Sequence, residues 1–335
     1  MSDIKVSILC LAFNHEKYIA DAIEGFLKQK TDFAYEIIIN EDASTDGTAE
    51  IIRQYERRFP DMIHPIYHKQ NQYSQGVNIN DKFMVPLARG KYVALCDGDD
   101  YWIDPYKLQK QYDAMEANPN CRMCLHKARE ENLSTGRSDT FIPRTELQTG
   151  VMSSYEFFTE LGKSNFFNEV CYFFRRDDYY EYQHNYPGFA AASMKTKTDD
   201  TPMLLYFGQL GDVYYINEDL AVYRHFVSGS WSDQFSNASE SKMRAWCASG
   251  YEMYTLFNAY TDNKYAEPLA RKLKFIRYKL AEVEKDYKTM AGDYCKEILD
   301  SQSANTAFRV RMMAKCPCLF GPLFSIYDKV KHGKQ

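Results

Sequence analysis

The sequence predicts an α/β fold with a mainly parallel sheet flanked by helices, on the strength of two observations. Short apolar runs alternate with segments whose apolar residues recur at helical spacing, which is typical of βαβ units. Acidic clusters follow directly after two of those runs, at Glu41-Asp42 and at Asp97-Gly98-Asp99-Asp100. Because right-handed crossovers make such strands parallel, we expect both clusters at the same edge of one sheet.

The expected elements alternate along roughly the first third of the chain. Strands are marked by apolar runs that turn residues close, and helices by apolar residues three or four positions apart. The predicted strands cover 5–14, 35–40, 62–68 and 92–96, and the predicted helices lie over 16–28 and around Ile51, Ile52 and Tyr55.

The carboxylates within residues 97–100 indicate a cation site. They repel one another and are costly to bury unless a positive charge compensates them. A hard divalent cation, Mg²⁺ or Mn²⁺, prefers carboxylate, water and phosphate oxygens as ligands. The cluster therefore points to an enzyme that handles a metal-bound diphosphate, and the competing interpretation is a solvated acidic turn.

Three motifs in order carry a resemblance to a known family. Residues 6–19, residues 41–48 (EDASTDGT) and residues 90–100 (GKYVALCDGDD) resemble family 2 glycosyltransferases of the GT-A fold. The resemblance is strong over residues 1–120, weaker to about 235, and is nearest to bacterial enzymes that build capsule, O-antigen or other surface polysaccharides. It implies an inverting transfer from a nucleotide-diphosphate sugar, with UDP as the default carrier, to a hydroxyl of a glycan or lipid-linked acceptor.

The resemblance also implies roles for individual residues on the donor side. Asp97 and Asp99 match the family's DXD motif, in which the first carboxylate contacts the donor ribose and the last binds the metal. Asp100 either assists at the metal or caps the following turn. Asp42, with Glu41 beside it, matches the acidic residue that contacts the nucleobase or ribose. The loop of Ala12, Phe13 and Asn14 would border the base, although Asn14 is equally typical of a helix cap.

The acceptor side is marked by a second acidic segment. An acceptor hydroxyl must lose a proton as it attacks, so a positioned carboxylate is expected as general base. By resemblance the base is Asp200, with Asp199 as the alternative, and the competing interpretation is capping of the helix that follows. Arg224 is either a clamp for the diphosphate or a structural ion pair. His225 lies one position before the family's usual histidine, and residues 228–232 form a candidate lid.

Composition limits the other function classes. A formal net charge of −5 opposes a nucleic-acid partner, which normally requires a basic face. The absence of glycine from residues 10–18 disfavours a nucleotidyltransferase and a dinucleotide-dependent oxidoreductase. A non-catalytic nucleotide-sugar-binding scaffold stays open, although Asp99 and Asp200 would have no role in one. Nine cysteines without framework spacing, and no visible secretory signal, lead us to expect a cytoplasmic protein.

The expected organisation is a catalytic GT-A unit followed by helices. Residues 1–235 form that unit, with a nucleotide-sugar-binding half (1–130) and an acceptor half (131–235). Within it, 130–149 is expected to be an exposed connection and 212–225 two short strands. Residues 236–335 form a helical extension that packs on the catalytic unit or on another subunit of a homodimer. The basic and apolar tail, 305–335, predicts either peripheral contact with the inner face of the membrane or a docked terminal helix.

Overall fold

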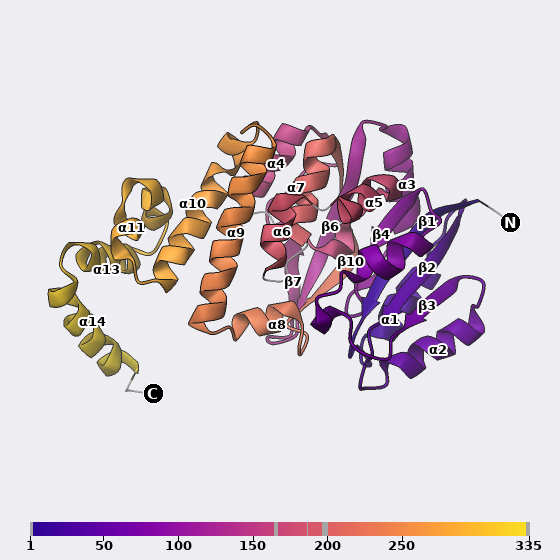
Figure 1. Cartoon of the computed structure of the whole chain (residues 1–335), viewed down its shortest axis with the longest axis horizontal. Helices are drawn as coiled ribbons and strands as arrows, with labels where there is room; N and C mark the ends of the chain where they lie inside the picture. Colours follow the sequence, from indigo (N-terminus) through magenta and orange to yellow (C-terminus); the bar gives the residue numbers. More distant parts are fainter. Residues whose placement is uncertain (1–2, 164–166, 186, 196–199, 333–335) are drawn as a thin grey trace.

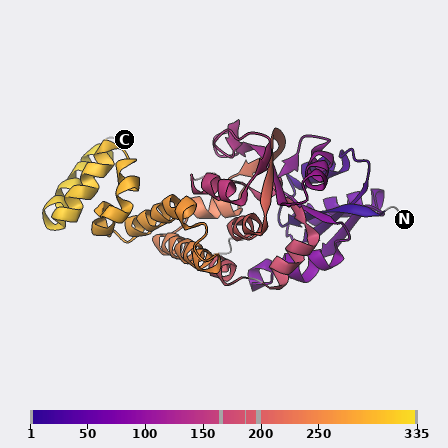
Figure 2. The ribbon, with the colours of Figure 1, turned by 90° about the horizontal axis from the view of Figure 1, so that it is seen from above.

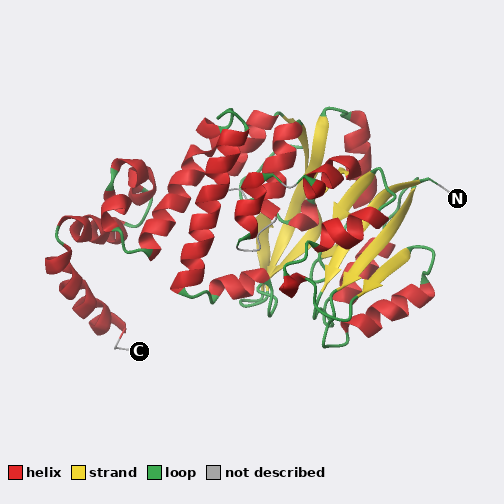
Figure 3. Ribbon diagram, in the orientation of Figure 1, coloured by secondary structure: helices red, strands yellow, loops and turns green. Residues whose placement is uncertain are grey.

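The computed structural model describes residues 3–163, 167–185, 187–195 and 200–332 (Figure 1). These residues form one large sheet with helices on both faces, followed by helices that extend to one end of the molecule (Figure 3). The α/β fold with a C-terminal helical region, as predicted, is confirmed. The strand order in the main path of the sheet is β3-β2-β1-β4-β9-β6-β10-β5.

The first half of the sheet is parallel. Strand β1 (Ile4–Ala12) pairs in parallel with β2 (Ala34–Glu41) and with β4 (Tyr92–Leu95), and β2 pairs in parallel with β3 (Ile63–Tyr67). Helix α1 (Ile19–Leu27) follows β1 and buries its predicted apolar face. The carboxyl ends of β1, β2 and β4 therefore meet at one edge of the sheet, as the sequence predicts.

The second half of the sheet is mixed, so the expectation of a mainly parallel sheet holds only in part. Strand β9 (Phe173–Arg175) lies antiparallel between β4 and β6 (Cys121–Asn132). Strand β10 (Asp212–His225) is parallel to β6. Three short strands, β5 (Tyr101–Trp102), β7 (Arg137–Ile142) and β8 (Gly150–Met152), add antiparallel pairs.

Two segments differ from the sequence-based expectation. Residues 212–225 form one strand rather than two, because register shifts between Ile216 and Ala221 absorb the polar turn residues without ending the pairing to β6. Residues 130–149 are not simply an exposed connection, because β6 and β7 form an antiparallel hairpin there. Glu130 is buried in that hairpin, where it accepts a hydrogen bond from Arg144.

Helices cover the sheet and continue beyond it. The helices other than α1 are α2 (Thr48–Arg58), α3 (Lys107–Ala117), α4 (Ser154–Gly162), α5 (Arg176–His184), α6 (Gly188–Met194), α7 (Asp200–Leu210), α8 (Trp231–Ser236), α9 (Glu240–Tyr260), α10 (Ala266–Val283), α11 (Tyr287–Ala291), α12 (Lys296–Asp300), α13 (Ala304–Lys315) and α14 (Pro317–His332). Short 3₁₀ or π turns cover Tyr73–Gln75, Asn80–Met84, Val85–Leu87, Glu169–Cys171 and Asp293–Cys295.

The C-terminal helices divide between two hydrophobic cores. Helices α9 and α10 bury Phe257, Leu269 and Ile276 in the same core as the sheet. Beyond Tyr278 a second, smaller core is formed by α11, α12 and α13, and Figure 2 shows this part projecting from the end of the molecule. Within the described ranges, no helix is both long and apolar enough to cross a membrane. Membrane contact through 305–335 stays a prediction.

Gly162, the last residue of α4, sets how closely α10 approaches α4. A Cβ atom placed on Gly162 would overlap the carbonyl oxygen of Pro268 in the first turn of α10. We expect Gly162→Ala to lower the free energy of unfolding by about 1–3 kcal/mol, because the two helices would have to move apart. Urea unfolding measures this loss.

Gly188→Ala is the matched control for this substitution. A Cβ atom on Gly188, at the start of α6, would meet no heavy atom within 4 Å. Its free energy of unfolding should stay within about 0.5 kcal/mol of the parent chain. Equal stability of the Gly162→Ala and Gly188→Ala proteins would contradict the tight contact between α4 and α10.

Candidate functional site

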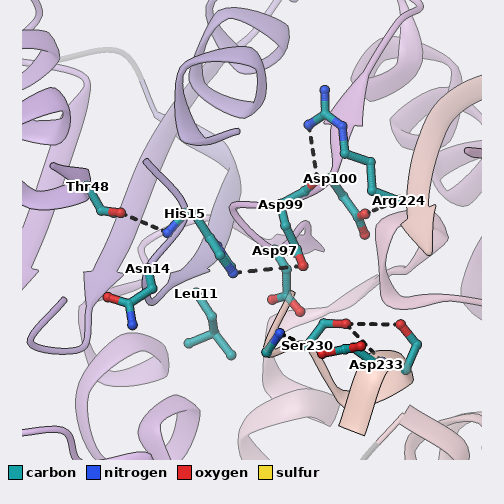
Figure 4. A network of polar contacts seen from close by, with 12 residues as sticks. Leu11, Asn14, His15, Thr48, Asp97, Asp99, Asp100, Arg224, Ser230 and Asp233 are labelled. Atoms are coloured by element: carbon teal, nitrogen blue, oxygen red, sulfur yellow. Dashed lines mark hydrogen bonds and ion pairs between the residues drawn. The ribbon is translucent and has the colours of Figure 1, made fainter. Parts of the chain in front are cut away.

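The acidic turn that follows β4 lies at the sheet edge where β1 and β2 also end. The Gly98 amide donates to Leu11 O at 2.8 Å, and the Asp100 amide donates to Asp97 O at 3.1 Å. A Cβ atom on Gly98 would lie 2.8 Å from Ile19 Cδ1 and 2.9 Å from His15 Nδ1. Glycine therefore lets the turn press against the loop after β1, and Figure 4 shows Asp97, Asp99 and Asp100 side by side there.

Burial makes the carboxylates of Asp97 and Asp100 difficult to ionise. The pKa of Asp97 is raised to about 7, first by burial and then by the charges of Asp99 and Asp200. The pKa of Asp100 is raised well above its ordinary value by burial and by Asp99, and is partly lowered by a hydrogen bond from Arg224. Such shifts mark a place where negative charge accumulates without full compensation from the protein.

Arg224 compensates one of the acids and holds the turn in place. Its backbone amide donates to Asp100 Oδ1 at 2.7 Å, and its Nη1 donates to Asp99 O at 3.0 Å. Its guanidinium forms ion pairs with Asp21 at 2.5 Å and with Glu131 at 3.3 Å. The side chain is only 8 % exposed, so this geometry favours the structural ion pair over the diphosphate clamp.

The loops after β1 and β2 are bound to each other. The Asn14 amide donates to Ser44 Oγ at 3.0 Å, and Asn14 Oδ1 accepts from the Thr45 amide at 2.8 Å. Asn14 has a positive φ of 57°, which asparagine tolerates better than most residues. Asn14 does not cap α1, whose N-cap is Tyr18. The cap interpretation of Asn14 is therefore wrong, because its side chain joins the two loops instead.

The predicted donor-side acids Glu41 and Asp42 are buried and already hydrogen-bonded. Glu41 Oε1 accepts from the Ser44 amide at 2.7 Å. The Asp42 carboxylate accepts from the backbone amides of Gln72 at 2.7 Å and Tyr73 at 3.0 Å. These bonds fix the loop around residues 71–75 beside the sheet edge, and each carboxylate oxygen retains room for a further donor.

Ala12 and Phe13 complete the edge between the two acidic clusters. Ala12 is buried, and its carbonyl oxygen accepts from the Asp42 amide at 3.0 Å. Phe13 is 42 % exposed, so its ring is available as a packing surface. The structure brings together the residues predicted for donor binding, although their contact with a nucleotide stays a prediction.

Asp200 approaches the same cluster from the other half of the chain. It is the first residue of α7, and its Oδ1 accepts from the Thr201 amide at 2.7 Å. Its charge contributes to the raised pKa of Asp97. Helix capping and a role at the site are therefore both open to Asp200. Asp199 lies outside the described residues.

His15 is a member of the site that the sequence interpretation missed. Its Nε2 lies 3.8 Å from Asp99 Oδ2, and its backbone amide donates to Thr48 Oγ1 at 2.8 Å. Within the described part of the chain, its buried Nδ1 atom has no hydrogen-bond partner. A signal was present, because His15 follows Asn14 in a loop already predicted to lie at the functional edge.

His225 points to a different partner. Its Nδ1 lies 2.8 Å from Glu130 Oε1, and this bond, with the nearby Arg144, lowers the pKa of Glu130 to about 2. In the described residues, no group of three or more His, Cys, Asp and Glu side chains has the arrangement of a complete metal site. Asp97 and Asp99 nevertheless fit a divalent cation that also takes phosphate and water ligands, because both offer hard oxygen atoms at one poorly compensated place.

Comparison with known sequences identifies relatives over most of the chain. The family model "Glycosyl transferase family 2" matches residues 7–183. An uncharacterized protein of Mycobacterium tuberculosis is 32% identical over 260 residues, which are 77% of this chain and 68% of that protein. TuaG of Bacillus subtilis, a glycosyltransferase assigned to teichuronic acid biosynthesis, is 36% identical over 110 residues, 33% of this chain and 41% of that protein.

Solved structures share the fold at low sequence identity. Staphylococcus aureus TarS 1–349 in complex with UDP-GlcNAc aligns with a TM-score of 0.54 and 13% identity, covering 98% of this chain and 92% of that one. A mannosyltransferase of Pyrobaculum calidifontis, in complex with GDP-Man and Mn²⁺, aligns with a TM-score of 0.54 and 14% identity, covering 98% and 91%. The resemblance to a glycosyltransferase fold is thereby confirmed, and the chain belongs to glycosyl transferase family 2.

Proposed function

We propose that this protein is an inverting glycosyltransferase that moves a sugar from a UDP-sugar to a hydroxyl of a glycan or lipid-linked acceptor in surface polysaccharide biosynthesis. The observation that carries the proposal is that Asp200, the first residue of α7, lies near enough to Asp97 for its charge to raise the pKa of that carboxylate. A donor-side acid pair and a separate acid on an acceptor-side helix are what a single displacement requires. UDP-GlcNAc bound to TarS supports the choice of carrier.

The proposed roles follow from the positions of the residues. Ala12, Phe13, Asn14, Glu41 and Asp42 line the nucleotide side of the sheet edge. Asp97 and Asp99 would hold a divalent cation, Mn²⁺ or Mg²⁺, and the Mn²⁺ complex of the Pyrobaculum enzyme supports this choice. When bound, such a cation supplies positive charge to the departing diphosphate.

The remaining acids have different tasks in the proposal. Asp200 accepts the proton of the attacking hydroxyl, with Asp199 as the alternative base. Asp100 and Arg224 act as positioning residues, because they fix the acidic turn through each other. Residues 1–235 carry the donor and acceptor halves, and residues 236–335 form the helical extension.

Asp99→Ala should abolish turnover, because it removes the acid that is proposed to bind the cation. We expect release of UDP from a panel of UDP-sugars with Mn²⁺ to fall by at least about a hundredfold. Asp113→Ala, which removes an exposed acid from α3, is the control and should keep full activity. Undiminished UDP release by Asp99→Ala would exclude Asp99 as the acid that binds the cation, whereas the absence of UDP release by the parent chain would favour the non-catalytic scaffold.

Asp200→Asn should separate donor binding from chemistry. The amide oxygen can still accept from the Thr201 amide, so α7 keeps its first hydrogen bond. We expect the thermal shift with UDP and Mn²⁺ to stay unchanged, while UDP release to water falls by about 10²–10⁴-fold. Parent-like turnover of Asp200→Asn would exclude Asp200 as the base and leave Asp199 as the candidate.

Asp97 gives the metal-free protein a characteristic pH dependence. Its pKa is about 7 in the folded chain, against about 3.9 in an unfolded one. The folded state therefore binds the proton more tightly, and the stability this provides is lost as pH rises from about 4 to about 7. The asparagine of Asp97→Asn cannot ionise. The free energy of unfolding of this variant, relative to that of the parent chain, should therefore rise by up to roughly 1.4 kcal/mol per pH unit over that interval.

Urea unfolding in EDTA between pH 4 and pH 8 measures this gain. Addition of UDP and Mn²⁺ at pH 8 should stabilise the parent chain and not Asp97→Asn, because a neutral amide is a weak ligand for a hard cation. A stability difference that does not change with pH would contradict the raised pKa.

A further inference from the structure

A small, partly open cavity lies beside the proposed base, between α7 and the helical region. Its volume is about 70 Å³, and its walls include Thr201 of α7, Met253 and Tyr254 of α9, and Lys272 of α10. A space of this size holds a few water molecules or one small polar group rather than a whole sugar ring. The cavity is therefore suited to one substituent of a larger molecule.

Two polar groups that are buried or partly buried line this cavity, the hydroxyl of Tyr254 and the ammonium group of Lys272. Tyr254 is only 1 % exposed, and its hydroxyl has no hydrogen-bond partner in the part of the chain that is described. Lys272 is partly buried, and the charge that acts on its ammonium group among the described residues is that of Asp200. Buried polar groups are normally satisfied, so such a pair at a cavity wall points to a bound group.

The cavity is electrostatically coupled to Asp200. Burial lowers the pKa of Lys272, and the charge of Asp200 partly restores it. Asp200 also adds to the raised pKa of the Tyr254 hydroxyl, which is due first to burial. Thr201, whose amide donates to Asp200, forms part of the cavity wall. A group held in the cavity would therefore lie within reach of the field of the proposed base.

Gly250 leaves room for such a group. It lies inside the 21-residue helix α9, where glycine costs helix stability relative to alanine. A Cβ atom there would be 3.8 Å from Ile276 Cδ1 and would meet no other residue closely. Helix packing therefore does not require glycine at position 250, and the absence of a side chain there makes the cavity larger.

We propose that this cavity is an acceptor subsite for an anionic group, a phosphate or a carboxylate carried by a polyhydroxylated acceptor. Lys272 supplies the positive charge, and the hydroxyls of Tyr254 and Thr201 supply hydrogen bonds. Asp200 would repel such an anion. The positive charge of Lys272 offsets this repulsion, so that the anion and the Asp200 carboxylate can lie near each other. The inference rests on the proposed function, because it takes Asp200 as the base, and it gives the helical region a part in acceptor recognition.

Binding of small probes to the full chain tests the subsite without a donor. Dissociation constants for glycerol 1-phosphate, glucuronate and neutral glycerol can be measured by ligand-observed NMR. We expect one or both anions to bind and glycerol not to bind. Lys272→Met should weaken anion binding by about tenfold or more, and Lys272→Arg should stay within about threefold of the parent chain.

Lys279→Met is the matched control on the same helix. Lys279 pairs with Glu282 at 2.7 Å on the exposed side of α10, so its loss should leave anion binding unchanged. Gly250→Ala is a second test that does not depend on the charge. It should keep or raise the melting temperature, because alanine favours the helix, while it weakens anion binding by narrowing the cavity.

The outcomes distinguish this inference from the proposed function. Equal anion binding by the parent chain and Lys272→Met, binding of glycerol as tight as that of the anions, or no anion binding at all would overturn the subsite. A thermal shift with UDP and Mn²⁺ reports on the donor side independently. Donor binding without anion binding removes the subsite alone. Anion binding without donor binding removes the proposed function, and the cavity then remains an anion site without an acceptor role. Binding of only one anion identifies the group as phosphate or carboxylate.

Discussion

The site depends on one electrostatic constraint. Several carboxylates lie close together at one edge of a buried sheet, where burial and mutual repulsion make their ionisation unfavourable. Parallel pairing of β2 and β4 with β1 brings the carboxyl ends of the three strands together, and acids follow at the ends of β2 and β4. Burial and mutual repulsion raise the pKa values of Asp97 and Asp100. A protein accepts this electrostatic cost at a functional site, where a ligand can later relieve it.

The protein compensates the negative charges of this turn unequally. Arg224 satisfies Asp100 through its backbone amide and holds the Asp99 carbonyl, and its guanidinium is in turn held by Asp21 and Glu131. Among the described residues, no comparable cation is directed at Asp97. Burial and the charges of Asp99 and Asp200 all raise the pKa of Asp97, and no interaction lowers it. Arg224 thus fixes the turn at Asp100, whereas the charge of Asp97 is not compensated by the described residues. That asymmetry separates a positioning acid, Asp100, from the acids proposed to bind the cation.

Local patterns predicted much of this arrangement, and long-range pairing decided the rest. The strands and helices of residues 4–67, the sheet edge that gathers the acids and the helix after Asp200 follow from periodicity and turn residues. The single strand at 212–225 could not be predicted locally, because pairing with β6 carries it past its own polar residues. The roles of Arg224 and Asn14 were likewise undecided, since their partners Asp21, Glu131 and Thr45 are distant in sequence.

We propose that the acids after β4 hold a cation at the nucleotide diphosphate. Anomalous diffraction from crystals grown with UDP and Mn²⁺ would locate that cation. We expect a manganese peak within coordination distance of the Asp99 carboxylate, with the diphosphate on its other side and the uracil next to the loop of Ala12, Phe13 and Asn14. A manganese peak elsewhere, or UDP bound away from this sheet edge, would contradict a cation site at these acids.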